Sequence, residues 1–227
     1  MLTAIFIFFI VCHLALLILS SKIHSNGFSI WWLRLLLCGV LYDNSMVMLS
    51  SIYGADESLQ FANQMRWYAH SLILPFLSLF TYKMLQHAGY KGADKLWCKA
   101  LFIIVTVCAL SYGILHEILQ LELTSKLLTS PVGEMERFVS VSKIPPLATI
   151  GTNLFAIIWA AVVWKKANWP WMFAGALCIF VINAASATSQ YGFVLGNLAE
   201  VIFIASLLAT VNYFAKDQVA ANMVHAN

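Results

Sequence analysis

The sequence predicts an all-α integral membrane protein: a single domain over residues 1–227, built as a polytopic bundle of seven transmembrane helices. Of its 227 residues, 61% are apolar and only 10% are charged. A soluble domain carries about 25% charged residues because its surface faces water. A helix needs roughly 20 mostly apolar residues to cross the hydrocarbon core of a bilayer. The chain is long enough for seven such helices with short connections, and it leaves no room for a separate soluble domain.

Turn-forming and charged residues separate the expected spans. The first apolar stretch has no basic residue before Lys22, so we interpret it as a retained helix and not as a secretory signal. Pro145 and Pro146 precede the fifth span, Pro170 opens the sixth, and the weakest joint lies around Gly192. The expected spans are residues 2–20, 29–52, 64–86, 96–118, 147–165, 170–190 and 196–215.

Basic residues orient the chain. If the spans alternate in direction, one side of the membrane receives Lys22, Lys83, Lys91, Lys95, Lys99, Lys165, Lys166 and Lys216. The opposite side receives Lys126, Arg137 and Lys143. Because Lys and Arg concentrate in cytoplasmic loops, we expect the N-terminus outside and the C-terminus in the cytoplasm. The chain is thus expected to be a multi-pass protein of a cell membrane, the inner membrane of a bacterium, with the lipid bilayer as its partner and no nucleic acid.

One connection, residues 119–146, is much longer than the others. Residues 121–128 and 135–141 have the composition of two short amphipathic helices lying on the outer face. Such helices either rest on the membrane surface or form a lid over the bundle.

Polar side chains within the spans gather in the outer half of the predicted bundle. Ionisable groups in hydrocarbon cost free energy and usually face the bundle interior. Arg66 and His70 are four residues apart and share one helix face, and Arg66 needs a carboxylate at its depth. We therefore expect Asp43, Arg66, His70 and Glu200 to line an outward-facing cavity. The other residues expected to contact a ligand at this depth are Tyr42, Asn44, Asn153, Asn183, Asn197, His116 and Glu117.

The third expected span contains Arg66-Trp67-Tyr68-Ala69-His70, followed by Pro75 nine residues after Arg66. This stretch resembles the third helix of microbial rhodopsins, which implies seven helices with an outer N-terminus. That family holds retinal on a lysine of the seventh helix, four residues after an acidic residue. Glu200 stands at the acidic position, but Ile204 stands at the lysine position. The resemblance therefore comes without a covalent retinal.

A second resemblance concerns placement. Asp43 on the second span and Glu200 on the last are similar to the acidic pair of small fungal seven-helix terpene cyclases. The segments around Asp43 and Arg66 also resemble those of small bacterial membrane proteins. The resemblance to the terpene cyclases implies acid chemistry on an isoprenoid.

Two classes of function follow from the polar layer, and a purely structural role stands beside them. In the first class, the chain is an enzyme that acts on an apolar lipid or isoprenoid. Asp43 or Glu200 then acts as general acid, and His70 or the other carboxylate takes up the final proton. Alternatively it is a non-enzymatic binder, sensor or carrier of a small hydrophobic ligand. The same polar groups also suit a network that only ties helices together.

No metal or cofactor is expected. His70 and His116 lack the spacing of metal ligands. His13, His70 and His116 lie at different depths, which does not suit the axial ligands of a haem.

Overall fold

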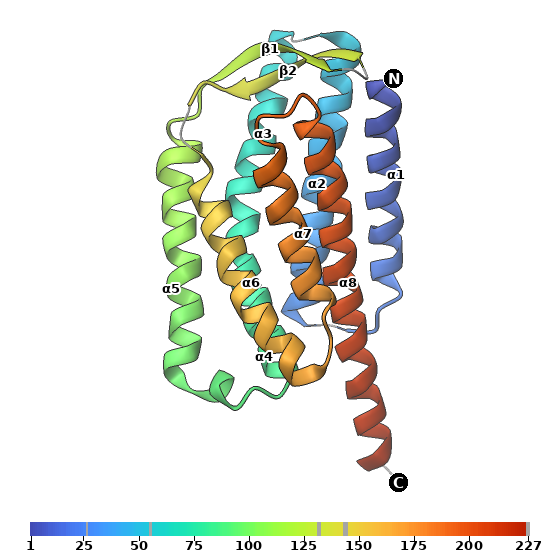
Figure 1. The fold of residues 1–227 in the computed structure, drawn as a ribbon, viewed down its shortest axis with the longest axis vertical. Coiled ribbons are helices and arrows are strands. Elements are labelled where there is room, and N and C mark those ends of the chain that lie inside the picture. Colours follow the sequence, from blue (N-terminus) through green and yellow to red (C-terminus); the bar gives the residue numbers. More distant parts are fainter. Residues whose placement is uncertain (26, 55, 131–132, 143–144, 226–227) are drawn as a thin grey trace.

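The computed structural model describes residues 1–25, 27–54, 56–130, 133–142 and 145–225, so Lys143 lies outside the described residues. Helices run lengthwise in one bundle (Figure 1). They are α1 (Leu2–Ser21), α2 (Phe28–Tyr53), α3 (Glu57–Ile73), α4 (Leu77–His87), α5 (Leu96–Tyr112), α6 (Leu147–Ala167), α7 (Trp171–Ser186) and α8 (Gly192–His225). Three short segments join them: the 3-10 helices η1 (Leu74–Phe76) and η2 (Lys91–Asp94), and the π-helical η3 (Gly113–Ile118).

Five helical stretches in the described residues are long and apolar enough to cross a membrane. They are Leu2–Ser21, Phe28–Tyr53, Leu96–Ile118, Leu147–Ala167 and Gly192–Lys216. Helix α7 is apolar but shorter. These stretches support the assignment of the chain to a membrane.

The third expected span is divided in the structure. Helices α3 and α4 are joined directly by η1, which has Pro75 at its centre. Proline has no backbone N–H and its ring clashes with the preceding turn, so a regular α-helix cannot continue through it. A 3-10 turn at Pro75 keeps the two helices in one rod with a local change of winding.

Helix ends differ from the expected span ends. Helix α3 begins at Glu57 instead of residue 64, and α8 begins at Gly192 and runs to His225 instead of covering 196–215. Helix α7 ends at Ser186, four residues before the expected end. The expected limits follow apolar runs, whereas a helix continues through polar residues for as long as its backbone hydrogen bonds can form.

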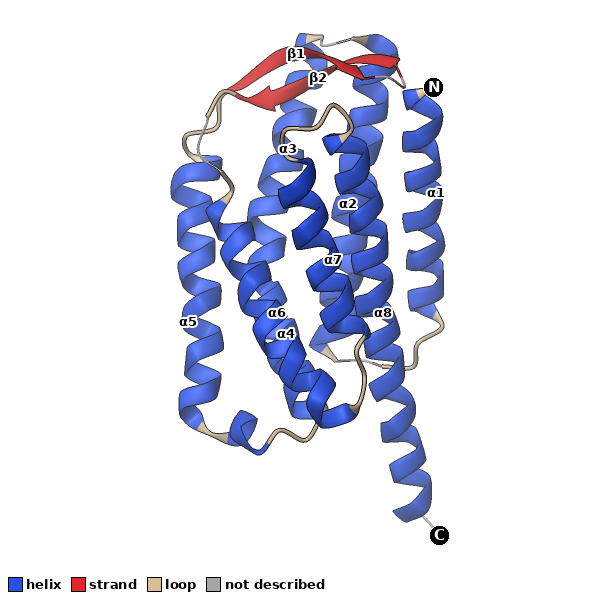
Figure 2. Cartoon of the chain, in the orientation of Figure 1, coloured by secondary structure: helices blue, strands red, loops and turns tan. Residues whose placement is uncertain are grey.

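The expectation of two amphipathic helices at 121–128 and 135–141 was wrong. Strands β1 (Leu123–Ser130) and β2 (Gly133–Ser140) form an antiparallel hairpin, paired from Leu123↔Ser140 to Ser130↔Gly133. The hairpin lies across the end of the bundle that holds the N-terminus (Figures 1 and 2). Thr, Val and Phe in these segments favour strands, and Gly133 takes a φ of 130° that other residues rarely adopt.

Buried apolar residues fix the hairpin to the helices. Met135 of β2 belongs to a small cluster with Leu2, Phe6 and Val47 of α1 and α2. A larger apolar cluster fills the bundle further from the hairpin, with contributions from α2, α4, α5, α6, α7 and α8. The hairpin is therefore packed onto the bundle, and the polar residues lie between it and the larger apolar cluster.

Candidate functional site

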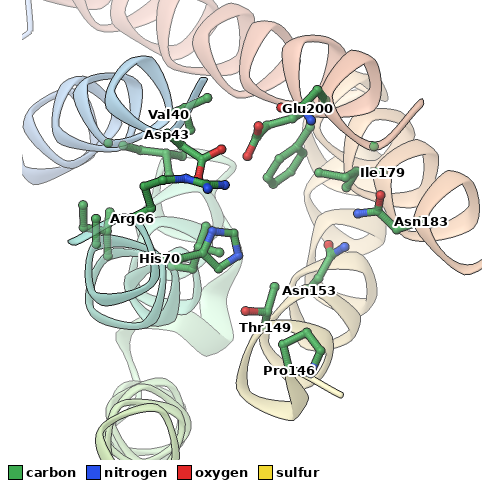
Figure 3. Close-up of a pocket in the computed structure, with 18 of the residues that line it drawn as sticks. Val40, Asp43, Arg66, His70, Pro146, Thr149, Asn153, Ile179, Asn183 and Glu200 are labelled. Carbon is green, nitrogen blue, oxygen red and sulfur yellow. The ribbon is translucent and has the colours of Figure 1, made fainter. Parts of the chain in front are cut away.

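A cavity of about 380 Å³ lies between α2 and α3 on one side and α6, α7 and α8 on the other (Figure 3). This volume is within the range of small-molecule sites. Eight of the residues that the sequence singled out line it: Asp43, Arg66, His70, Glu117, Asn153, Asn183, Asn197 and Glu200. The structure thus brings together polar groups from helices that are distant in sequence.

An ion pair between α2 and α3 forms one wall. Arg66 Nε donates to Asp43 Oδ1 at 2.8 Å, and Arg66 Nη1 donates to Asn63 Oδ1 at 2.8 Å. Asn63 is held in turn because its Nδ2 donates to the Leu59 carbonyl and to Ser50 Oγ. The Arg66 side chain is only 5% exposed, whereas that of Asp43 is 32% exposed. Arg66 is therefore enclosed by protein, and the Asp43 carboxylate is the member of the pair that is open to the cavity.

Glu200 faces this ion pair from α8, and His70 points into the cavity from α3 (Figure 3). His70 follows Arg66 by one helical turn, so both side chains project from the same side of α3. Among the described residues, no cation lies within salt-bridge distance of Glu200. Glu200 is therefore a carboxyl group without charge compensation, opposite one that has it.

Amide groups form the opposite wall. Asn153 of α6 and Asn183 of α7 lie across the cavity from Arg66 and His70 (Figure 3). Asn153 Oδ1 is buried and accepts no hydrogen bond within the described part of the chain. A Cβ at Gly196 would lie 2.9 Å from Asn183 Oδ1, so glycine at this position leaves room for the amide.

Glu117 enters the cavity from η3. Ser71 Oγ donates to Glu117 Oε2 at 2.8 Å, while Oε1 is buried without a partner in the described residues. Gly113 permits η3 to approach α3, because a Cβ there would lie 3.2 Å from the Ser71 carbonyl oxygen. π-Helical turns are frequent at functional sites, where the wider turn redirects a side chain. The charges of Glu117 and Asp43 both act on His70.

Three residues of the expected set do not line the cavity. Tyr42 donates its hydroxyl to the Ala62 carbonyl at 2.8 Å, which ties α2 to α3. Asn44 is fully buried and donates to the Val40 carbonyl of its own helix. His116 is exposed and packs against the Tyr112 ring at 4.7 Å between centroids. Adjacent residues point in different directions on a helix, and of these three neighbours on α2 only Asp43 lines the cavity.

Four cavity residues with polar side-chain atoms were not predicted from the sequence as part of the site: Trp67, Arg137, Thr149 and Thr152. Trp67 Nε1 is buried without an acceptor in the described residues. Arg137 was counted only as a loop cation, and its role in the lining depends on the hairpin. Burial lowers the pKa of Arg137 to about 10; the charge of Arg66 adds to this effect and that of Asp43 opposes it. Its guanidinium therefore remains charged at neutral pH.

No family model and no curated protein matches the chain. Within the described residues, no three His, Cys, Asp or Glu side chains come together as metal ligands would. The chemistry of the cavity is therefore the basis for a functional assignment.

Proposed function

We propose that the chain crosses a cell membrane seven times, with α3, η1 and α4 acting as one span. The N-terminus and the hairpin lie at one end of the bundle and the C-terminus at the other (Figure 1). With spans that alternate in direction, eight lysines fall on the side of the membrane that holds the C-terminus. Because Lys and Arg concentrate in cytoplasmic loops, this bias supports a cytoplasmic C-terminus. The hairpin and the nearby polar cavity are then on the outer side.

Cysteine labelling tests this orientation. Ser125 on β1 and Lys91 on η2 are exposed and lie at opposite ends of the bundle. We expect Ser125→Cys to react with a membrane-impermeant maleimide in intact spheroplasts, and Lys91→Cys to react only after permeabilisation. The wild-type chain, with its own five cysteines, gives the background. Labelling of Lys91→Cys but not Ser125→Cys in intact spheroplasts would show the reverse orientation.

We propose further that the cavity carries out acid–base chemistry on an apolar lipid or isoprenoid. One observation carries this proposal: the uncompensated carboxyl group of Glu200 faces the Asp43–Arg66 ion pair across a cavity of ligand size. Arg66 already balances the charge of Asp43, so we assign the proton-donor role to Glu200. His70, which opens to the same cavity, is placed to take up a proton.

The proton balance of such a reaction is simple. Glu200 gives its proton to a double bond of the substrate, and a cationic intermediate forms. His70 then removes a proton from a neighbouring carbon, and the product is an isomer of the substrate. Transfer of that proton from His70 back to Glu200 restores both groups for the next turnover. The reaction consumes no oxidant or second reactant. Phe203 and Trp67 line the cavity, and aromatic faces stabilise nearby positive charge.

Conversion of a co-purified lipid tests this assignment. The protein is purified, its bound lipids are identified by mass spectrometry, and each is incubated with fresh enzyme. We expect Glu200→Gln to lower turnover by about 10²–10⁴-fold, the usual contribution of a general acid or base. Glu122→Gln makes the same change at an exposed position outside the cavity and should leave turnover unchanged.

Two outcomes would contradict the assignment. Normal turnover by Glu200→Gln would remove Glu200 from the proton-transfer step. A lipid that binds wild-type protein in the cavity but is never converted would indicate the non-enzymatic alternative, a binder, sensor or carrier.

A further inference from the structure

The hairpin holds a cation firmly at one end of the cavity. Arg137 lies in β2 between Met135 and Phe138, which are only 2% and 5% exposed. Met135 packs in one cluster with Leu2 and Phe6 of α1, so the strand is fixed to the bundle two residues before Arg137. Arg137 is therefore presented to the cavity by a packed element and not by a loose connection.

The charge of Arg137 has no partner within the described residues. Its side chain takes part in no salt bridge or hydrogen bond there, and its Nε is buried without an acceptor. A buried charge without a partner is costly, and an Arg guanidinium suits carboxylate and phosphate oxygens in particular. An anionic ligand would supply the missing acceptors.

None of the three acidic residues that line the cavity pairs with Arg137. The Asp43 carboxylate is paired with Arg66. Glu117 accepts a hydrogen bond from Ser71 and its charge acts on His70. Glu200, as the proposed acid, is neutral before it gives up its proton. Arg137 is thus a cavity cation without an ion-pair partner among the described residues.

The lining changes from polar to apolar away from the hairpin. Leu36 lies seven residues from Asp43 along α2, about 10 Å at 1.5 Å per residue. Leu77 and Ile204 line the same end and are almost fully buried. A ligand that satisfies both ends has an anionic head and an apolar chain.

We infer that Arg137 binds the phosphate or carboxylate head group of an amphiphile whose apolar chain extends past Glu200 toward Leu36 and Ile204. The inference rests on the proposed function only in treating this cavity as the substrate site. It names the substrate class as an anionic lipid or isoprenoid, and it gives the hairpin the task of recognising the head group. The same head-group chemistry is available from free phosphate, and the experiment separates the two.

Binding to purified full-length protein in a neutral maltoside detergent tests the inference. The probes are dodecyl phosphate, dodecanoate, dodecanol and inorganic phosphate, and binding is followed by quenching of tryptophan fluorescence and by native mass spectrometry. We expect wild-type protein to bind the two anionic probes at least about 10-fold more tightly than dodecanol, because hydrogen bonds to charged groups are the strong ones. Inorganic phosphate should bind much more weakly than dodecyl phosphate.

Matched variants locate the effect. Arg137→Gln should lose the preference for anionic probes, and Arg137→Lys should keep part of it. Lys126 is the register partner of Arg137 in the hairpin but is exposed and outside the cavity. Lys126→Gln removes the same charge from the same hairpin and should bind like wild type. The inference would be overturned if Arg137→Gln and Lys126→Gln bound the anionic probes equally well. It would also be overturned if wild-type protein bound dodecanol, or inorganic phosphate, as tightly as dodecyl phosphate.

Glu200→Gln separates this inference from the proposed function. If Glu200→Gln and wild type both prefer anionic probes but neither converts any lipid, the proposed enzyme activity fails and the head-group site stands. If Arg137→Gln converts a co-purified lipid normally and shows no altered preference, the head-group site fails and the enzyme activity stands.

Discussion

Replacement of Arg66 with Met should lower the free energy of unfolding by about 3–5 kcal/mol, the usual cost of removing one partner from a buried ion pair. The change removes the cation from Asp43 and the donor from Asn63 Oδ1, and it does so where the Arg66 side chain is 5% exposed. Met preserves most of the side-chain length. The measurement is a denaturant or thermal unfolding curve in neutral detergent.

Two further variants show whether the effect belongs to the ion pair. The double variant Arg66→Met with Asp43→Asn should recover part of the loss, because no uncompensated charge remains, and the cycle gives the coupling energy. Arg34→Met removes an arginine that donates to the Ser20 carbonyl at the other end of the bundle and is only half-buried. Its expected cost is about 1 kcal/mol. An Arg66→Met protein as stable as Arg34→Met would show that the ion pair contributes little to stability.

Gly175→Ala should destabilise the packing of α7 on α8. A Cβ at this position would overlap Ser206 Oγ and lie 2.6 Å from Ser206 Cβ, so the two helices would have to move apart. Overpacking of this kind costs about 1–3 kcal/mol. Small residues let membrane helices approach closely, and this contact depends on one. The measurement is again the unfolding curve.

The reciprocal change provides the rescue. Ser206→Gly removes both atoms that the new Cβ would meet, so Gly175→Ala with Ser206→Gly should regain most of the lost stability. Gly151 lies on α6 with nothing within 4 Å of a built Cβ. Gly151→Ala should therefore stabilise its helix by up to about 1 kcal/mol. No rescue by Ser206→Gly, or an equal loss at Gly151, would show that the α7–α8 contact is not the cause.

Composition and apolar runs predict most of the helical structure, because lipid-facing and buried positions in a bundle are both apolar. The hairpin was missed because residues 121–128 and 135–141 mix polar and apolar residues in a way that fits an amphipathic helix or a strand pair. Only the pairing of the two segments decides between them, and that pairing is not local.

The cavity could be predicted in part for a similar reason. A charge requirement links Arg66 to a carboxylate at its depth, and the structure pairs it with Asp43. Helical spacing places His70 beside Arg66. The contribution of Arg137 could not be predicted, since it depends on the hairpin crossing the end of the bundle. Tyr42 and Asn44 were candidates by adjacency, and the helical rotation between neighbours turns them toward other partners.

The first turn of α1 is a structural support of the hairpin, and this matters for anyone who handles the protein. Leu2 is 3% exposed and shares a cluster with Met135, two residues before Arg137. An affinity tag or fluorescent reporter fused to the N-terminus would add bulk one residue from Leu2, close to the strand that carries Arg137. Helix α8 extends well past the other helices at the opposite end (Figure 1). A fusion at the C-terminus leaves the head-group end of the cavity untouched and is the appropriate choice for the binding and turnover assays.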